Sequence, residues 1–321
     1  MFLRRSAAFS KKLRNFQIRY VALRDHYYSY MQLGRFPSNT LSLQKMNTWP
    51  EHSMSLYELF ASAWRNQELI SQLTKREIIG RYRGSVMGLA WSFLNPILML
   101  LVYTVFFAVV FKARWSDSTN ESHVGFAIIL FVGLIVHGLF SECVNRAPWL
   151  IVQNVNYVKK VVFPLEILPV VTSISALVHA GISLIVLLSA QMLFNHSIPW
   201  TSIFFPLIIA PFVFVVVGVA WFLAAIGVFV RDITHVTGIL TSVMLFMSPV
   251  FYSVSSLPER LQPWLMLNPL TFVIEQSRNV LIYSKPPDWK SLVVYSTLSV
   301  AIAWVGFWWF QKTRKGFADV L

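Results

Sequence analysis

Few side chains in this sequence of 321 residues could carry out covalent chemistry. Cys143 is the single cysteine, which excludes an internal disulfide and a cysteine cluster for zinc or an iron–sulfur centre. The pattern G-x-x-x-x-G-K-[ST], which cradles nucleotide phosphates in P-loop ATPases, does not occur. Neither do paired carboxylates or an H-x-x-x-x-D constellation that would suggest a membrane-embedded transferase. We therefore expect no enzyme, no metal site and no cofactor in this chain, and any ATP-driven step needs a separate ATPase.

Two histidines lie in apolar stretches where a transport site could be. His137 and His179 could relay protons, or each could stay neutral and hydrogen-bond to a neighbouring helix. The centres of these stretches contain no Asp, Glu, Lys or Arg, while Glu142 and Glu166 fall at their ends. Carriers driven by protons or sodium usually keep ionisable groups deep in the membrane, so secondary transport is disfavoured. Two further classes of membrane protein stay open at this point: a stand-alone carrier or channel, and a membrane-bound glycan-modifying enzyme.

The composition predicts an all-α membrane protein that positions these side chains. Hydrophobic residues make up 56% of the chain, the mean hydropathy is +0.58, and charged residues make up 13%. Charged residues reach about 25% in typical soluble domains. A soluble protein of this length could not bury so much apolar surface, so lipid must cover it and the chain is polytopic.

Six apolar segments predict six transmembrane helices, because about 20 apolar residues cross a bilayer as a helix. The stretch from 167 to 230 is too long for one crossing, so we divide it at the turn-forming residues 195–200. The predicted spans are 88–111, 124–144, the two halves of 167–230, 233–258 and 291–311. Together they define a transmembrane domain over residues 88–311.

The segment Leu261–Ile274 does not fit this pattern. It is uncharged but only 14 residues long, and it contains Pro263 and Pro269. Such a segment is too short to cross the membrane and too apolar for an ordinary loop. It predicts a re-entrant or interfacial element between the fifth and sixth spans. The alternative is an amphipathic loop on the surface.

The basic residues predict the orientation of the spans. The net charge is +13, and 21 of the 27 Lys and Arg residues lie on the side that holds both termini if there are six spans. The positive-inside rule places that side in the cytoplasm. This asymmetry accounts for the basic charge without nucleic acid as a partner. Residues 312–321 form a basic cytoplasmic tail in this interpretation.

The first 50 residues differ from the rest. They contain nine Lys or Arg and one acid, Asp25, and no apolar core long enough for a secretory signal. We interpret residues 1–50 as a disordered extension or as the product of a start assigned too early. An organellar transit peptide and a functional tail are the alternatives.

Residues 55–84 predict an amphipathic cytoplasmic helix in the headgroup layer. Ser55 and Glu58 have capping-box spacing, and an apolar stripe leads into a basic end. Arg81 and Arg83 at that end could bind a lipid diphosphate, because guanidinium groups suit phosphate, or they could simply anchor the helix at the membrane.

Aromatic residues make up 15% of the chain. Many lie at span ends, where such rings form interfacial belts. Others could line a pore, because the C–H faces of sugars stack well on aromatic rings. The candidates for a pore or for the re-entrant element are Trp91, Tyr103, Tyr252, Trp264, Asn268 and Pro269.

Several motifs follow one another along the chain. Residues 73–96 contain Leu-Thr-Lys-Arg-Glu-Ile, Arg-Tyr-Arg-Gly-Ser, Gly-Leu-Ala-Trp and Asn-Pro, and residues 154–169 read NVNYVKKVVFPLEILP. Further on are MSPVFY at 247–252, Leu-Pro-Glu at 257–259, Asn-Pro-Leu at 268–270, and Arg278. In this order the motifs resemble those of ABC-2 type permeases that export polysaccharide. The resemblance covers about residues 55–321 and leaves residues 1–50 outside.

The resemblance implies a homodimer of six-span subunits, bound to two copies of a separate ABC ATPase that holds ATP and Mg. It implies the bacterial cytoplasmic (inner) membrane as location and a polyprenyl-diphosphate-linked glycan as substrate. We favour the O-antigen of lipopolysaccharide, with capsular polysaccharide or teichoic acid as the alternative. The residues expected to couple the permease to the ATPase are Asn154, Asn156, Tyr157, Lys159, Lys160, Phe163, Pro164 and Glu166, with Arg231 and Asp232 near a second contact.

Overall fold

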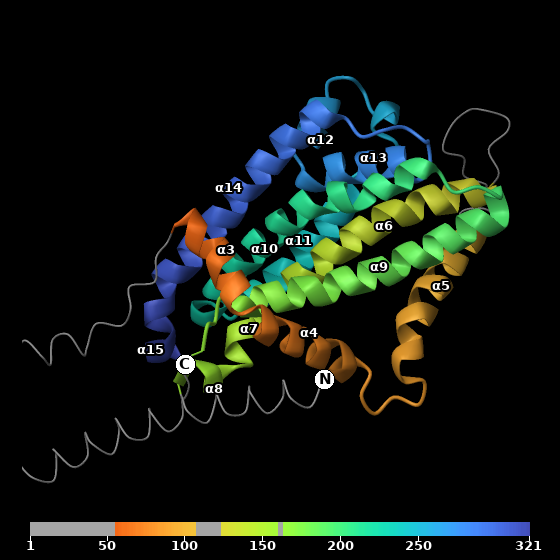
Figure 1. Cartoon of the computed structure of the whole chain (residues 1–321). Helices are drawn as coiled ribbons and strands as arrows, with labels where there is room; N and C mark the ends of the chain where they lie inside the picture. Colours follow the sequence, from red (N-terminus) through yellow and green to blue (C-terminus); the bar gives the residue numbers. More distant parts are fainter. Residues whose placement is uncertain (1–54, 107–122, 160–162) are drawn as a thin grey trace, which may run out of the picture. The chain divides into compact units, whose positions relative to one another are not determined.

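The computed structural model describes residues 55–106, 123–159 and 163–321, all of which belong to one compact unit (Figure 1). The predicted extension 1–50, the end of the predicted first span at 107–111, and Lys160 lie outside the described residues. Within the described ranges the regular structure is helical, and no strand occurs. The prediction of an all-α protein is confirmed for this part of the chain.

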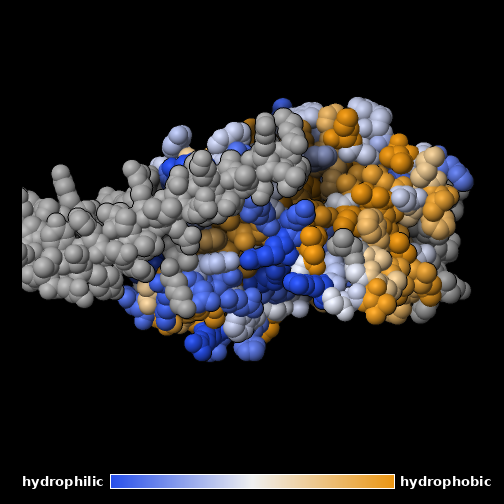
Figure 2. All heavy atoms as spheres, turned by 60° about the horizontal axis from the view of Figure 1, so that its bottom comes forward, coloured by the Kyte–Doolittle hydropathy of each residue, from blue (hydrophilic) through white to orange (hydrophobic). Residues whose placement is uncertain are grey.

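Four helices in the described part of the chain are long and apolar enough to cross a membrane. Two shorter apolar helices accompany them, so that each predicted span contains one apolar helix. The four are α6 (His123–Arg146), α9 (Ile167–Asn195), α10 (Phe205–Phe229) and α14 (Trp289–Thr313), and the shorter two are α5 (Trp91–Tyr103) and α11 (Ile233–Met247). The face in Figure 2 is hydrophobic on the right, where α5 lies, and hydrophilic in its centre. The chain is therefore a multi-pass membrane protein.

The predicted division of residues 167–230 is confirmed. Helix α9 ends at Asn195, and the next residue, His196, has a left-handed backbone with φ of 54°. The chain then forms the short helix η3 (Trp200–Phe204) and continues into α10. Two antiparallel helices joined by a short turn result.

Helix α11 is shorter than the predicted fifth span, 233–258. It ends at Met247 because Ser248 precedes Pro249, and a residue before proline avoids the helical conformation. Ser248 is extended instead, with φ of −100° and ψ of 152°. At 15 residues, α11 extends over about 22 Å, less than the roughly 30 Å hydrocarbon core of a bilayer.

The segment between α11 and α14 folds into short helices. They are η4 (Val254–Ser256), α12 (Gln262–Met266) and α13 (Pro269–Leu281). Helix α13 begins at a proline, and the Asn268 side chain caps it by accepting a hydrogen bond from the amide of Leu270 at 2.9 Å. One face of α13 is fully buried against α6 and α10. Residues 269–281 are thus a packed helix and not a surface loop.

Helix α10 lies at the centre of the bundle and approaches α14 very closely. A Cβ atom added to Gly306 on α14 would lie 2.1 Å from the carbonyl oxygen of Gly218 on α10. One added to Gly218 would lie 2.8 Å from the Cα of Ala303. Only small residues fit at this crossing, as is common where membrane helices pack.

The predicted single helix over residues 55–84 is wrong. The structure has two helices, α3 (Leu56–Arg65) and α4 (Gln67–Arg81), with a break at Asn66. The Asn66 side chain donates a hydrogen bond to the carbonyl oxygen of Ser62 at 2.8 Å, and such side-chain bonds compete with helix continuation. The predicted cap is confirmed, since Ser55 accepts a hydrogen bond from the amide of Glu58.

The remaining short helices gather at the end of the bundle where α9 begins and α10 and α14 end (Figure 1). They are α7 (Trp149–Val152), α8 (Val155–Lys159), η5 (Arg314–Gly316) and α15 (Phe317–Val320), while η1 (Gly88–Ala90) precedes α5. The last residues are not a free tail, because Phe317 is fully buried and packs against Phe310.

Candidate functional site

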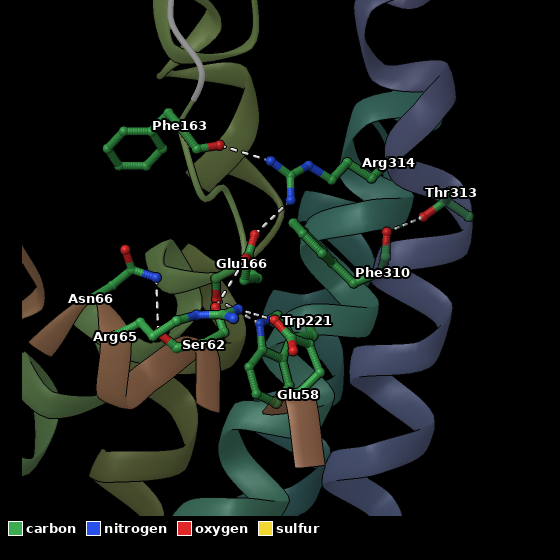
Figure 3. A network of polar contacts seen from close by, with 10 residues as sticks. All are labelled: Glu58, Ser62, Arg65, Asn66, Phe163, Glu166, Trp221, Phe310, Thr313 and Arg314. Atoms are coloured by element: carbon green, nitrogen blue, oxygen red, sulfur yellow. Dashed lines mark hydrogen bonds and ion pairs between the residues drawn. The ribbon is translucent and has the colours of Figure 1, made fainter. Parts of the chain in front are cut away.

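A polar network centred on Glu166 joins four parts of the chain (Figure 3). Ser62 on α3 donates a hydrogen bond from Oγ to Glu166 Oε1 at 2.9 Å. Arg314 donates from Nη1 to Glu166 Oε2 at 2.7 Å, and from Nη2 to the carbonyl oxygen of Phe163 at 2.7 Å. Trp221 on α10 donates from Nε1 to the Glu166 carbonyl oxygen at 2.8 Å. The predicted coupling residues Phe163 and Glu166 are therefore bonded to α3, α10 and the C-terminal segment.

This network contains an ion pair between the buried carboxylate of Glu166 and the half-buried Arg314. Glu166 is only 7% exposed, and both of its carboxylate oxygens have a donor. It directly precedes α9, and the positive end of a helix dipole favours a carboxylate there. Removing one partner of a fully buried pair typically costs about 3–5 kcal/mol, and the cost is smaller here because the Arg314 side chain is 15% exposed. The network thus joins α3, the 163–166 loop and the C-terminal segment through side-chain hydrogen bonds.

An aromatic contact links this loop to α8. The rings of Tyr157 and Phe163 stack with centroids 4.3 Å apart, and Arg76 on α4 donates a hydrogen bond to the Tyr157 hydroxyl at 3.3 Å. Asn156 and Lys159 point to solvent on α8. Among the other predicted coupling residues, Asn154 bonds to the carbonyl oxygen of Leu150, and Pro164 is half-buried.

Arg231 and Asp232 lie at the same end of the bundle. They are exposed in the turn between α10 and α11. Two residues earlier, Phe229 contacts Phe317 with ring centroids 5.9 Å apart, and α15, which carries Phe317, lies against α8. The structure thus places both predicted coupling segments around the C-terminal helix. Their role as ATPase contacts stays a prediction.

The two arginines predicted to bind phosphate have different surroundings. Arg81 forms an ion pair with Glu142 on α6, and Arg146 pairs with Glu77 on α4 at 2.6 Å. Burial lowers the pKa of Arg81, but the hydrogen bond and charge of Glu142 outweigh burial, so the net shift of the pKa is upward. Arg83 is exposed and has no ion pair within the described residues.

This charged cluster lines a polar cavity of about 490 Å³ between α4 and α6. Sequence reasoning recorded Glu142 and Arg81 separately and missed their pairing. The four-residue spacing of Glu142 and Arg146 on one helix was a signal for part of the cluster. The partners on α4 are more than 60 residues away in sequence, and no local pattern indicates them.

The pore candidates are distributed over several elements. Trp91 and Tyr103 are half-buried on α5, Tyr252 follows α11, and Trp264 on α12 is 73% exposed. Asn268 has a clear structural role, because its Nδ2 donates to Ser248 Oγ at 2.9 Å and to the Met247 carbonyl oxygen at 3.2 Å. The carbonyl oxygen of Pro269 accepts a hydrogen bond from the Tyr295 hydroxyl at 3.0 Å. Asn268 and Pro269 therefore fix α13 against the end of α11 and against α14.

Arg278 on α13 is a buried residue whose role sequence reasoning missed. It is 1% exposed, and its guanidinium donates to the carbonyl oxygens of Ile129 at 3.3 Å and Val250 at 3.0 Å. Its Nη1 is 3.0 Å from Glu275 Oε1. A Cβ atom at Gly133 would lie 3.3 Å from Nη2, so glycine leaves room for the guanidinium. Arg278 thereby joins α13, α6 and the turn after α11.

The two histidines differ. The Nε2 atom of His137 is 2.9 Å from the carbonyl oxygen of Thr241 on α11, which is a hydrogen bond to a neighbouring helix. The ring of His179 makes an edge contact with Tyr82, with centroids 6.0 Å apart. Within the described residues, no group of three or more His, Cys, Asp or Glu could hold a metal ion.

Comparison with known protein families identifies the family of this chain. Residues 68–282, from α4 to the end of α13, match the family described as "ABC-2 type transporter". The chain belongs to this family. ABC-2 transporter membrane chains work with an ABC ATPase, so an ATPase partner is implied for this protein.

Characterised relatives of this ABC-2 transporter chain cover most of its length. The chain is 28% identical over 266 residues to "O-antigen export system permease protein RfbA" of Myxococcus xanthus, which covers 82% of this chain and 99% of the relative. The protein of the same name from Klebsiella pneumoniae is 23% identical, over 79% of this chain and 95% of the relative. "Polysialic acid transport protein KpsM" of Escherichia coli is 22% identical, over 74% and 90%.

Proposed function

We propose that this chain is the permease subunit of an ATP-driven ABC exporter that moves a lipid-linked polysaccharide, such as O-antigen, across the cytoplasmic membrane. The observation that carries this proposal is the match to the Myxococcus xanthus O-antigen export permease over 99% of that protein. The similarity to KpsM supports capsular polysaccharide as a second candidate within the same class. In either case the chain itself catalyses no reaction, and the partner binds ATP and Mg.

The proposed topology has six spans, formed by α5, α6, α9, α10, α11 and α14. The basic residues argue for two cytoplasmic termini. Helix α11 alone is too short to cross, and α12 with α13 would complete that region as a re-entrant element. The proposed assembly is a homodimer with two ATPase subunits in the bacterial inner membrane.

The proposed coupling site is the end of the bundle that carries α7, α8 and the 163–166 loop. A push on α8 would reach the loop through the Tyr157–Phe163 stack, and the ion pair of Glu166 with Arg314 would carry it to α14. The Ser62 hydrogen bond would carry it to α3. Pro164 and Pro169 prevent a continuous helix from the loop into α9, so loop and helix can move separately.

The proposed substrate path lies between α5, α11 and the α12–α13 element, which would part to open a polar, aromatic-lined passage. Arg83 is the better candidate for the lipid diphosphate, because Arg81 is already paired with Glu142. Trp264, exposed on α12, is the better-placed ring for stacking on a sugar.

Purification of the full chain from its native membrane tests the proposal. We expect a stoichiometric P-loop ATPase to accompany the wild-type chain and to hydrolyse ATP. Lys159→Glu reverses an exposed charge on α8 and should remove most of the bound ATPase. Lys290→Glu makes the same change at the start of α14, and it should retain the ATPase. Recovery of the wild-type chain without any ATPase would favour a stand-alone carrier or channel.

A further inference from the structure

An apolar groove of about 830 Å³ lies between α3, α4 and the first turns of α9. One face of α4 forms its wall, with lining residues three and four positions apart. Behind this wall, Ile70 and Leu73 pack against Ile167 and Val171. The groove is thus part of the folded structure, and it falls in the size range of ligand pockets, about 300–1,000 Å³. Its apolar lining residues include Phe60, Trp64, Ile70, Ile78, Val170 and Ile174.

The lining fits an acyl chain better than a peptide segment. A peptide brings backbone N–H and C=O groups that need partners, and this lining offers few polar atoms. An acyl chain needs none. Phe60 and Trp64 line the groove and are 48% and 75% exposed, as aromatic side chains at a membrane interface are.

The charge beside the groove fits an anionic head group. Lys75 lines the groove, is exposed, and has no ion pair or hydrogen bond within the described residues. No acidic residue contributes to the lining. The buried hydroxyl of Thr74, also in the lining, has no hydrogen-bond partner in the described part of the chain and is free to donate to an ester oxygen.

We propose that this groove binds one anionic phospholipid, with an acyl chain between α4 and α9 and its phosphate at Lys75. The bound acyl chain fills the groove beside the direct contact of α4 with α9 and stabilises that contact. Helix α4 also carries Arg76, which bonds to Tyr157, and Arg81, which pairs with Glu142. The lipid is therefore a structural part of the contact between the interfacial helices and the bundle, whatever the protein transports.

Native mass spectrometry of the full chain, titrated in detergent with phosphatidylglycerol, tests this site. The wild-type chain should retain one phosphatidylglycerol in preference to phosphatidylcholine. Ile78→Trp fills the groove and should weaken retention about tenfold, since losing the burial of two methylene groups is enough for that. Ile185→Trp, at an exposed position further along α9, is the matched control and should change nothing.

Lys75→Gln tests the contribution of the lipid head group separately from that of the acyl chain. It should weaken phosphatidylglycerol binding about fivefold, the effect of one basic residue near an anionic lipid, and weaken phosphatidylcholine binding less, because the choline cation offsets the phosphate charge. Lys290→Gln is its control. This variant keeps the groove intact, so the test stands even if Ile78→Trp fails to fold.

Three outcomes would overturn the proposal. The first is equal retention of the two lipids by the wild-type chain, and the second is equal loss in Ile78→Trp and Ile185→Trp. The third is the formation of a protein adduct when a photo-crosslinking amino acid is placed at position 79, which also lines the groove. Its adduct should have the mass of a phospholipid, and an adduct with residues 1–54 or with a second copy of the chain would assign the groove to protein.

Discussion

Each end of the helical bundle contains an arginine, fully buried in the case of Arg278 and half-buried in the case of Arg314, and the two are bonded in different ways. Arg314 pairs with a carboxylate, Glu166, that belongs to another element and is itself buried. Arg278 is 1% exposed and donates mainly to backbone carbonyl oxygens, while its carboxylate partner Glu275 is 30% exposed and lies on the same helix. Helix α9 separates the two sites, because Glu166 precedes it and Gln191 near its other end bonds to α13.

The difference distinguishes a site that holds its elements fixed from a contact whose elements can separate. Arg278 satisfies backbone groups of α6 and of the turn after α11, and no other described side chain replaces it there. Arg314 connects side chains of separate elements, so the elements can separate if each charge finds water or another partner. We infer that the Arg278 end keeps its shape and that the Arg314 end can change its contacts.

The largest effect is expected for Arg278→Met, which keeps much of the side-chain volume and removes all the donors. The carbonyl oxygen of Val250 would lose its donor, at about 1–3 kcal/mol, and the carbonyl oxygen of Ile129 inside α6 and the carboxylate of Glu275 would each lose a hydrogen bond to a charged group. Thermal unfolding of the purified protein should therefore show a loss of about 2–5 kcal/mol of stability. Glu275→Gln is the contrasting variant, and a smaller loss of about 1–3 kcal/mol is expected because it removes the charged partner of Arg278 and leaves the contacts with the carbonyl oxygens in place. A stable Arg278→Met variant would contradict the fixed site.

An intermediate effect is expected at the other end. Glu166→Gln and Arg314→Met should each cost about 2–4 kcal/mol, since each leaves a charge without its partner in a buried network. The double variant should lose less than the sum, with a coupling of about 1–3 kcal/mol. Each single variant should also hydrolyse ATP with the partner ATPase while exporting less glycan. Additive stability losses would show that the two residues are not energetically coupled and would contradict the proposed contact between them.

The smallest effect on stability is expected for Arg83→Gln, because this arginine has no ion pair within the described residues. Stability should change by less than about 0.5 kcal/mol, while export should slow about fivefold if the residue binds the lipid diphosphate. Arg81→Gln is a contrasting variant, since it breaks the pair with Glu142 and should lower stability as well. Unchanged export in Arg83→Gln, with normal membrane insertion, would exclude the phosphate role.

The sequence predicted the apolar helices well because hydrophobic runs and the turn at 195–200 are local signals. The prediction from sequence failed where a few residues decide where a helix breaks or ends. The capping pattern at Ser55 located the start of α3, but the apolar stripe was interpreted as one continuous helix and the break at Asn66 was missed. The end of α11 follows from Pro249, which the length of the apolar run concealed.

The site was predicted in part. Phe163 and Glu166 were recognised from their motif, and the structure brings them together with Tyr157. Their partners Ser62 and Arg314 are 104 and 148 residues away from Glu166, so only the folded chain reveals them. Arg278 was recognised as part of a motif, but its role was not predicted, because nothing in its neighbouring residues indicates that it donates to carbonyl oxygens of α6 and of the turn after α11.

The contact of Gly306 with Gly218 gives α14 the geometry of a lever. The helix touches α10 backbone to backbone at this crossing, so a tilt of α14 on α10 would have its pivot there. Gly306 is 17 residues from Trp289 and 8 from Arg314, which at 1.5 Å per residue gives arms of about 25 Å and 12 Å. A tilt that shifts Arg314 by a given amount therefore shifts Trp289 about twice as far in the opposite direction.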